Sequence, residues 1–522
     1  MRSIDAVSIT NGSATRWADD HGVSTISPES MLLATSRAIP KSLIITGSLV
    51  RGIAMWRILS DEQLETLHSS ALSVLEKVGV RVVDSSTLRI FRDHGAAVDE
   101  KSKIVKLPPS LVEEAVRKAP REVTLGARNK KYAVTLKPGR MYTRASTGLT
   151  EVIDLETGLS RHGLSKDTAD ASRLIQDLSN VSINATHIFP SDTPPHVRDV
   201  HSFRLAMENC EKHVVTTPLS RTTLEVQKRI ASVYEESDSQ SPIFSSLVCP
   251  TSPLTLRDPV TIYCAKERIP AIVVSGVVVG VASPITLAGT LVQQSAECLA
   301  TITLMQIVNP GAPVIIGNKS SPLDQRYATP LSGVVEIGLL SAACVQVAQF
   351  YGIPGEGFGL RSDSKTIDEQ AGVERVFLGL LPALAGARLD SGAGSAEAIN
   401  TFSFEQLVID NEVYGMIERV LRGIDFDEER LALSEIASVG PGGSYLGLPH
   451  TRKFYLKEFY QHKLFDKKTR AAWETSGHKD IREQARLSVR RMLAEHKPVP
   501  QLGKDAQQKI STLVKEAESN VV

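Results

Sequence analysis

Short apolar runs alternate with longer amphipathic stretches from about residue 167 onward. The short runs are bounded by Gly, Pro and polar turn residues and are only as long as buried strands, so they predict β-strands. We predict seven strands, at 183–189, 214–217, 243–249, 271–275, 313–317, 353–358 and 387–391. The stretches between them predict helices near 197–211, 224–235, 259–268, 287–307, 333–351 and 368–385.

This regular alternation leaves two architectures, a closed eight-stranded barrel or an open doubly wound sheet. An open dinucleotide-binding sheet should place a G-x-G-x-x-G turn directly after its first strand. The closest match in this chain, 352–359, comes late and holds Pro354 and Glu356 where a phosphate would need free backbone amides. We therefore predict an α/β fold, a (β/α)₈ TIM barrel.

The part of the chain before this repeat has a different pattern. Ser60 with Gln63 predicts a capping box that starts an amphipathic helix, which Gly79 ends. Strand-like pieces follow at 123–125 and 132–136. We divide the chain into a poorly ordered or dispensable extension (1–55), an N-terminal α+β region (56–165), the barrel core (166–425) and a mostly helical C-terminal extension that packs on the barrel (426–522).

Composition and charge exclude several classes of protein. Lys plus Arg and Asp plus Glu both number 59, so no overall basic field attracts nucleic acid or an anionic membrane. No apolar run reaches the roughly 18 residues of a spanning helix. The five cysteines are widely spread and form no Cys-x-x-Cys pair, as in reduced proteins. We expect a cytoplasmic protein.

Barrel enzymes place their chemistry at the carboxyl ends of the strands. The polar or aromatic residues at those positions are His187, Thr216, Thr217, Thr251, Ser275, Asn318, Lys319, Glu356, Phe358, Arg361, Asp390 and Ser391. The 12 histidines show no His-Glu-x-x-His spacing, and neither a Walker loop nor a Gly-x-Ser-x-Gly elbow is present. We therefore predict no metal site, and motifs for hydrolysis, phosphoryl transfer and dinucleotide binding are not found.

Two glycine-rich segments remain, GIPGEGFGLRSDSK at 352–365 and SVGPGGSYLGLPHT at 438–451. Dense glycine lets backbone approach a bulky ligand closely, although ordinary barrel loops with tight turns would give the same composition. The first segment and its continuation also carry more ionisable groups than turn geometry needs: Glu356, Arg361, Asp363, Lys365 and Asp368.

With these segments in place, the chain resembles the trimethylamine methyltransferase family from Ile58 onward. The resemblance rests on dispersed matches in order: ALSVLEKVGV at 71–80, DLETG at 154–158 with Arg161, SPITLAG at 283–289, ECLA at 297–300, PGAP at 310–313, DSK at 363–365, DEQAG at 368–372, GPGG at 440–443 and HT at 450–451. The family consists of barrel proteins that demethylate amines and pass the methyl group to a cognate corrinoid protein.

The resemblance implies a substrate class as well. Trimethylamine enzymes of the family carry pyrrolysine in the barrel, close to the segment 359–363, where this chain has only standard residues. The chain is similar instead to the subgroup without pyrrolysine, which demethylates quaternary amines such as glycine betaine. A quaternary nitrogen is already charged and leaves as a neutral tertiary amine, so no special residue need activate it. The corrinoid would be presented by the partner, with no cofactor bound tightly by this chain.

Several side chains are candidates for holding such a substrate. A trimethylammonium group is attracted to aromatic faces, for which Phe358, Tyr142, Tyr327 and Tyr445 are candidates unless they only pack in the core. Glu356 could neutralise the cation or cap the following helix, and Asp363 is a second positioning candidate. Arg361 could hold a substrate carboxylate, assisted by His187 or Lys319, or could form a surface ion pair with Asp363.

Three alternatives stay open at this point. The chain could demethylate a tertiary amine such as trimethylamine, or it could bind quaternary amines without catalysis. It could also be a barrel enzyme that needs no corrinoid. In each case we expect a homo-oligomer.

Overall fold

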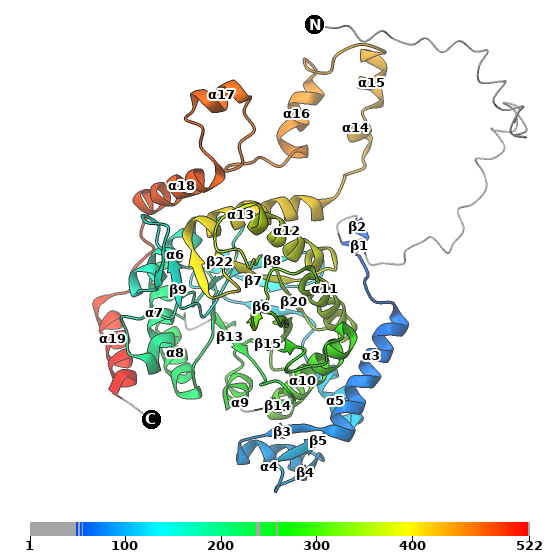
Figure 1. The fold of residues 1–522 in the computed structure, drawn as a ribbon, viewed down its shortest axis with the longest axis vertical. Helices are drawn as coiled ribbons and strands as arrows, with labels where there is room; N and C mark the ends of the chain where they lie inside the picture. The colour runs from blue at the N-terminus through cyan, green and yellow to red at the C-terminus, as the bar shows by residue number, and fades with distance from the viewer. Residues whose placement is uncertain (1–48, 51–52, 55, 236–240, 257–258, 520–522) are drawn as a thin grey trace, which may run out of the picture. The chain divides into compact units, whose positions relative to one another are not determined.

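A closed barrel of eight parallel strands forms the centre of the computed structural model, which describes residues 49–50, 53–54, 56–235, 241–256 and 259–519 (Figure 1). In order around the barrel, the strands are β11 (Asn184–Ala185), β12 (Val214–Thr216), β13 (Phe244–Val248), β15 (Ala271–Ser275), β17 (Val314–Asn318), β20 (Gly355–Phe358), β21 (Leu389–Ala393) and β8 (Tyr142–Ala145). A parallel bridge between Arg144 and Ile183 joins β8 to β11 and closes the ring.

A helix follows every barrel strand and lies on the outside. These are α6 (Ser165–Asp177), α7 (Arg198–Asn209), α8 (Arg221–Tyr234), α9 (Pro259–Lys266), α10 (Leu287–Val308), α11 (Val335–Phe350), α12 (Glu369–Leu384) and α13 (Phe404–Arg422). The barrel predicted from the seven strands and six helices is confirmed. The eighth strand, β8, lies within 56–165, so the barrel begins before the expected boundary at residue 166.

Alternation along each strand separates the two sides of the barrel wall. The strand residues divide between two buried clusters, both of which also contain helix residues. Ile183, Val215, Leu247, Ile272, Ile315 and Leu389 belong to one, and Val214, Phe244, Val273 and Val314 belong to the other. Because successive side chains of a strand point to opposite faces, the first set fills the interior and the second packs under the helices.

The region before the barrel covers its outside and one end. The predicted capping box is present in α3 (Asp61–Ser73), and Gly79 has a φ of +83° where the helix run ends. Next come β3 (Val80–Val82), α4 (Ser85–Asp93), β4 (Ala97–Asp99), β5 (Ile104–Lys106) and α5 (Pro109–Lys118). The expected extension at 1–55 lies almost wholly outside the described residues. The part of it that is described consists of two short strands, β1 (Leu49–Val50) and β2 (Ile53–Ala54), which pair with each other.

The two strand pieces expected at 123–125 and 132–136 form an antiparallel hairpin, β6 (Val123–Leu125) and β7 (Val134–Leu136). Its apolar side chains belong to the same cluster as the barrel interior. The amide of Gly126 donates to the carbonyl of Pro242, just before β13, at 2.9 Å. The hairpin therefore lies at the amino ends of the strands and leaves the carboxyl ends for chemistry.

Two small sheets follow directly from the carboxyl ends of barrel strands. One contains β9 (Glu151–Ile153), β10 (Ser160–His162), β22 (Ser395–Ala396) and β23 (Thr401–Ser403), which come after β8 and β21. The other contains β16 (Val278–Val279), β18 (Ser321–Asp324) and β19 (Thr329–Pro330), which come after β15 and β17.

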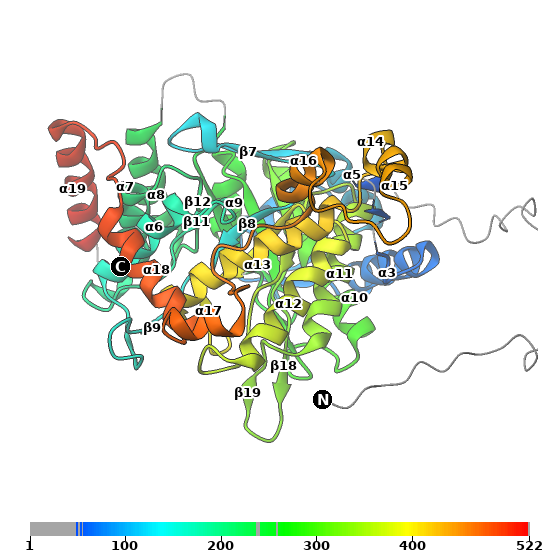
Figure 2. The same ribbon diagram turned by 90° about the horizontal axis from the view of Figure 1, so that it is seen from above.

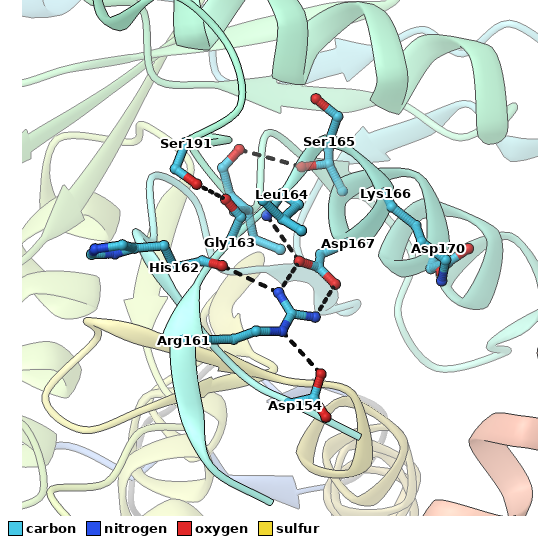
Figure 3. Close-up of polar contacts among 12 residues, drawn as sticks. Asp154, Arg161, His162, Gly163, Leu164, Ser165, Lys166, Asp167, Asp170 and Ser191 are labelled. Carbon is cyan, nitrogen blue, oxygen red and sulfur yellow. Dashed lines mark hydrogen bonds and ion pairs between the residues drawn. The ribbon is translucent and has the colours of Figure 1, made fainter. Parts of the chain in front are cut away.

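Arg161 fastens the first of these sheets to the barrel (Figure 3). Its guanidinium donates to Asp154 Oδ2 at 2.9 Å and bidentately to Asp167 at 2.7 and 2.9 Å. Asp167, in the first turn of α6, also accepts from the amide of Leu164 at 2.8 Å. The motif at 154–161 is thus a structural brace that connects the β9–β10 hairpin to the start of α6.

The C-terminal extension is helical: α14 (Glu428–Leu431), α15 (Leu433–Val439), α16 (Pro449–Glu458), α17 (Arg470–Thr475), α18 (Ile481–Glu495) and α19 (Lys504–Ser519). Helix α18 packs on α13 and α6, and α19 on α7 and α8 (Figure 2). No helix in the described part of the chain has the length and apolar character needed to cross a membrane.

A buried ion pair connects α12 with α13. Arg375 Nη1 donates to Asp410 at 2.9 Å, and both side chains are almost fully buried. Arg375 also donates to the carbonyl of Leu360, in the loop that follows β20, and to the carbonyl of Ser395, the first residue of β22. This one guanidinium therefore fixes a loop and a strand of the small sheet at the carboxyl end of the barrel.

We expect Arg375→Met to lower the free energy of unfolding by about 3–5 kcal/mol, because it leaves the Asp410 carboxylate buried without its cation. Urea unfolding of purified protein measures this difference. The matched control is Arg326→Met, which removes an arginine that is 79% exposed and paired with Asp324, and it should leave the unfolding midpoint nearly unchanged. If both substitutions lowered the free energy of unfolding equally, the buried Arg375–Asp410 pair would not have the special contribution expected of it.

A second prediction concerns acid stability. His213 is buried, donates from Nδ1 to the Gly126 carbonyl at 2.7 Å and accepts at Nε2 from Ser245 Oγ at 2.9 Å; burial lowers its pKa to about 4. In the unfolded chain the pKa returns to about 6.5, so between these pH values the unfolded state binds more protons. Stability should therefore fall as pH is lowered from about 6.5 to 4, and His213→Gln should reduce that slope by up to about 1.4 kcal/mol per pH unit. Urea titrations at several pH values test this, and an unchanged slope would refute it.

Candidate active site

An ion pair crosses the interior of the barrel near the carboxyl ends of its strands. Arg144 Nε on β8 donates to Glu356 Oε1 on β20 at 2.5 Å, and the two side chains are 2% and 1% exposed. Because β21 separates these strands in the ring, the side chains meet across the interior. Glu356 Oε2 has no hydrogen-bond partner among the described residues. Glu356 therefore does not cap α12, whose N-cap is Asp368.

Arg361 lies just beyond β20 and is the most unusual group of the site. It is 1% exposed, and none of its three guanidinium nitrogens has an acceptor among the residues described. The guanidinium lies against the ring of Phe358, and burial lowers its pKa well below the ordinary value. Because arginine stays protonated in proteins, Arg361 is a buried cation whose hydrogen bonds are unmade.

The surface ion pair considered for Arg361 and Asp363 does not form. Asp363 accepts instead from the backbone amides of Ser332 and Gly333, at 2.7 and 2.9 Å, in the segment before α11. Asp363 thus connects the loop after β20 to the start of the neighbouring helix, and it accepts no hydrogen bond from Arg361.

Lys319, which is partly buried directly after β17, adds a further basic group. Burial lowers its pKa, and the charges that act on it include Arg144, Glu356 and Arg361. These four groups therefore lie close enough to interact. Three bases and one carboxylate give this part of the interior an excess of positive charge.

Asp390 on β21 is a second carboxyl group near these charges. Burial raises its pKa well above the ordinary value, the nearby Glu356 carboxylate raises it further, and Arg361 lowers it. The hydroxyl of Tyr414 on α13 lies beside Asp390. A Cβ at Gly357 or Gly359 would collide with the Asp390 carboxyl, which explains two glycines of the segment 352–365 without a ligand.

The other predicted residues lie in different surroundings. His187 is fully buried, with its nitrogens 2.7 Å from Asn184 Oδ1 and 3.3 Å from the Ser146 carbonyl, and burial lowers its pKa to about 3. It is a neutral group at physiological pH. Tyr142 starts β8, and its ring faces the guanidinium of Arg140 at 4.8 Å.

Tyr327 and Tyr445 are both exposed. Tyr327 lies in the turn between β18 and β19, and Tyr445 lies between α15 and α16. The structure thus brings together Glu356, Phe358, Arg361 and Lys319, and it does not bring these two tyrosines to them. Whether any of these residues touches substrate stays a prediction.

Two residues with buried polar contacts near the carboxyl ends of the strands were missed by the sequence analysis. Arg144 gave no signal, because its partner Glu356 is 212 residues away in the sequence. Glu297 on α10 lay in a noted motif without an assigned role; it accepts from Ser252 Oγ, Ser275 Oγ and the Leu254 amide at 2.6–2.9 Å. Glu297 therefore holds the loop after β13 against the end of β15.

The described residues contain no group of three or more His, Cys, Asp or Glu side chains that could hold a metal ion. The site consists instead of a carboxylate, an aromatic ring and several bases. Such groups bind and orient a charged organic molecule, and they recognise carboxylates in particular.

Comparison with known proteins gives the family. The family model for trimethylamine methyltransferase (MTTB) matches residues 34–521, so the match starts earlier than the resemblance from Ile58. The trimethylamine methyltransferases of Methanosarcina barkeri and Desulfitobacterium hafniense are each 35% identical, covering 85% and 84% of this chain and 92% and 90% of their own length. The glycine betaine methyltransferase of Desulfitobacterium hafniense is 30% identical over 88% of this chain and 96% of its own.

These matches span the barrel, the two small sheets at its carboxyl end and the C-terminal helices. The relatives are named methyltransferases throughout, and the chain covers nearly their whole length. The chain therefore belongs to the trimethylamine methyltransferase family and is an enzyme of the methyltransferase class.

Proposed function

We propose that this enzyme transfers a methyl group from a quaternary amine that also carries a carboxylate, such as glycine betaine, to a corrinoid on a separate protein. The observation that carries the proposal is the buried Arg361, whose guanidinium has no acceptor among the described residues. A buried charge without partners costs several kcal/mol, and a bound carboxylate would supply the missing acceptors.

The surrounding charges support one orientation of the substrate, with its carboxylate toward Arg361. The carboxylate would lie against the buried Arg361, with the partly buried Lys319 nearby. The ammonium would lie toward Glu356 Oε2, which no donor in the described part of the chain satisfies, and toward the ring of Phe358. Cation–π contacts contribute roughly 0.5–2 kcal/mol each.

Methyl transfer requires little acid–base catalysis by these residues. The departing amine leaves neutral, so no proton need be supplied to it. The corrinoid would supply the nucleophilic cobalt when its carrier protein docks. The chain's own residues bind the substrate and align one methyl group, and good alignment can contribute up to about 7–11 kcal/mol. Asp363 is a positioning residue in this scheme, because it fixes the loop that carries Arg361.

One observation favours a different substrate. The trimethylamine methyltransferases are more similar to this chain, at 35% identity, than the glycine betaine enzyme at 30%. Trimethylamine has no carboxylate, however, so it would leave Arg361 unsatisfied. A binding protein without catalysis is the other rival. We further propose that the enzyme is cytoplasmic and forms a homo-oligomer.

The first test is a methyl-transfer assay. Purified enzyme with a cobalt(I) corrinoid and glycine betaine should yield methylcobalt, seen by absorbance, and dimethylglycine, seen by mass spectrometry. Trimethylamine should yield neither. Binding of betaine without turnover with any corrinoid would favour the binding protein, and failure with betaines, carnitine and choline would refute the quaternary-amine proposal.

The second test separates the carboxylate from the ammonium. Arg361→Met keeps an apolar chain of similar length and should lower kcat/KM for glycine betaine at least about 100-fold, because charge-assisted hydrogen bonds contribute roughly 1.5–3 kcal/mol each. Turnover of tetramethylammonium, which lacks a carboxylate, should not fall in parallel. Arg326→Met on the exposed β18–β19 turn is the control. Equal losses of kcat/KM for both substrates would show that Arg361 does not bind the substrate carboxylate.

A further inference from the structure

The segment 423–459 carries an unusual amount of exposed apolar surface. We call it the arm; it follows α13 and contains α14, α15 and α16. Ten large apolar side chains of the arm are 44–88% exposed: Ile424, Phe426, Leu431, Leu433, Ile436, Tyr445, Leu446, Tyr455, Leu456 and Phe459. Within its three helices only Phe454 is buried. The arm therefore has almost no core of its own.

The arm is attached to its own barrel mainly at its base. Arg419 on α13 donates to the carbonyls of Gly423 and Glu458, both at 2.9 Å. Figure 1 shows α14, α15 and α16 standing off from the barrel helices beyond α13. Helices of 4, 7 and 10 residues are too short to be stable alone in water, so their outer faces need a partner.

A second unpartnered apolar surface lies on the barrel itself. We call it the α11–α12 face; Val335 on α11 and Val373, Val376 and Phe377 on α12 are 38–59% exposed there. The last three follow helical spacing, so they form one stripe on α12. Outer faces of barrel helices are usually polar, and an exposed apolar patch of this kind marks an interaction site.

The charge of one helix of the arm is opposite to that of the α11–α12 face. Helix α16 exposes the basic Arg452 and Lys457, and its third base, Lys453, pairs with Glu429. The α11–α12 face exposes Glu336 and Glu369, and the one basic residue in either helix, Arg375, is buried. Most acids of the arm lie outside α16, so the match in charge concerns α16 and not the whole arm: Asp425, Asp427, Glu428, Glu429 and Glu435.

We propose that the arm of one copy packs on the α11–α12 face of a second copy, and that the exchange is reciprocal within a two-fold dimer. In a two-fold dimer the arm of each copy contacts the α11–α12 face of the other, so the same contact forms twice. Side chains of this size expose on the order of 1,000 Å² of apolar surface per arm. Two arms therefore suffice for the roughly 2,000 Å² or more typical of obligate homodimers.

The direction of α13 argues for a second copy over the methyl-accepting protein. Helix α13 follows β21 and runs back along the barrel, so it ends at Arg422 near the amino ends of the strands. The arm begins there, whereas Arg144, Glu356 and Arg361 lie toward the carboxyl ends. A methyl acceptor has to reach that opposite end.

Sedimentation velocity of the full-length chain at micromolar concentration tests the proposal. Wild-type protein should sediment as a dimer. Phe426→Asp or Leu446→Asp in the arm, and Phe377→Asp on the α11–α12 face, should each raise the dimer dissociation constant at least about 30-fold. Val281→Asp is the matched control, because Val281 is 67% exposed after β16 and outside both surfaces.

Mixing the variants tests reciprocity. A dimer of two arm variants, or of two face variants, has both contacts damaged, but a mixed dimer keeps one wild-type arm on one wild-type face. Mixing Leu446→Asp with Phe377→Asp protein should therefore restore dimers that neither forms alone. A monomeric wild type, variants that dimerise normally, or no restoration on mixing would overturn the proposal. So would arm variants that remain dimers but no longer bind the methyl-accepting protein.

Discussion

The Arg361 guanidinium is buried without a hydrogen-bond acceptor among the described residues, which is energetically unfavourable. The neighbouring carboxyl groups do not supply that acceptor. Arg144 already occupies one oxygen of Glu356, Asp363 binds backbone amides, and burial raises the pKa of Asp390, which disfavours its charged form. No carboxyl group among the described residues thus accepts a hydrogen bond from Arg361. The rest of the fold supplies the stability that offsets this cost, and a substrate carboxylate would recover part of it.

The loops at the carboxyl end are held by polar braces that lie outside the reacting centre. Arg375 with Asp410 fixes the loop after β20 and the start of β22, Arg161 with Asp167 fixes the β9–β10 hairpin, and Glu297 fixes the loop after β13. Each brace joins a loop to a barrel helix. Because methyl transfer depends on alignment more than on acid–base catalysis, such rigidity is the main contribution that this scaffold can make.

The sequence predicted the barrel because most of its strands are continuous apolar runs, such as Ala271–Ser275, followed by long helices. It missed β8, since Tyr142–Ala145 carries threonine and arginine in place of an apolar run. Glycine density and ionisable groups located the loop of Glu356 and Arg361, but not its burial, which depends on strands distant in the sequence. Tyr327 and Tyr445 were selected by residue type alone, and aromatic character does not distinguish a binding site from an exposed turn or an intermolecular contact.

The most direct measurement of the central claim is a crystal structure of the enzyme with glycine betaine bound. The account predicts that the carboxylate accepts hydrogen bonds from the Arg361 guanidinium while the trimethylammonium group lies toward Glu356 Oε2. Betaine bound elsewhere, or bound with its carboxylate away from Arg361, would contradict it.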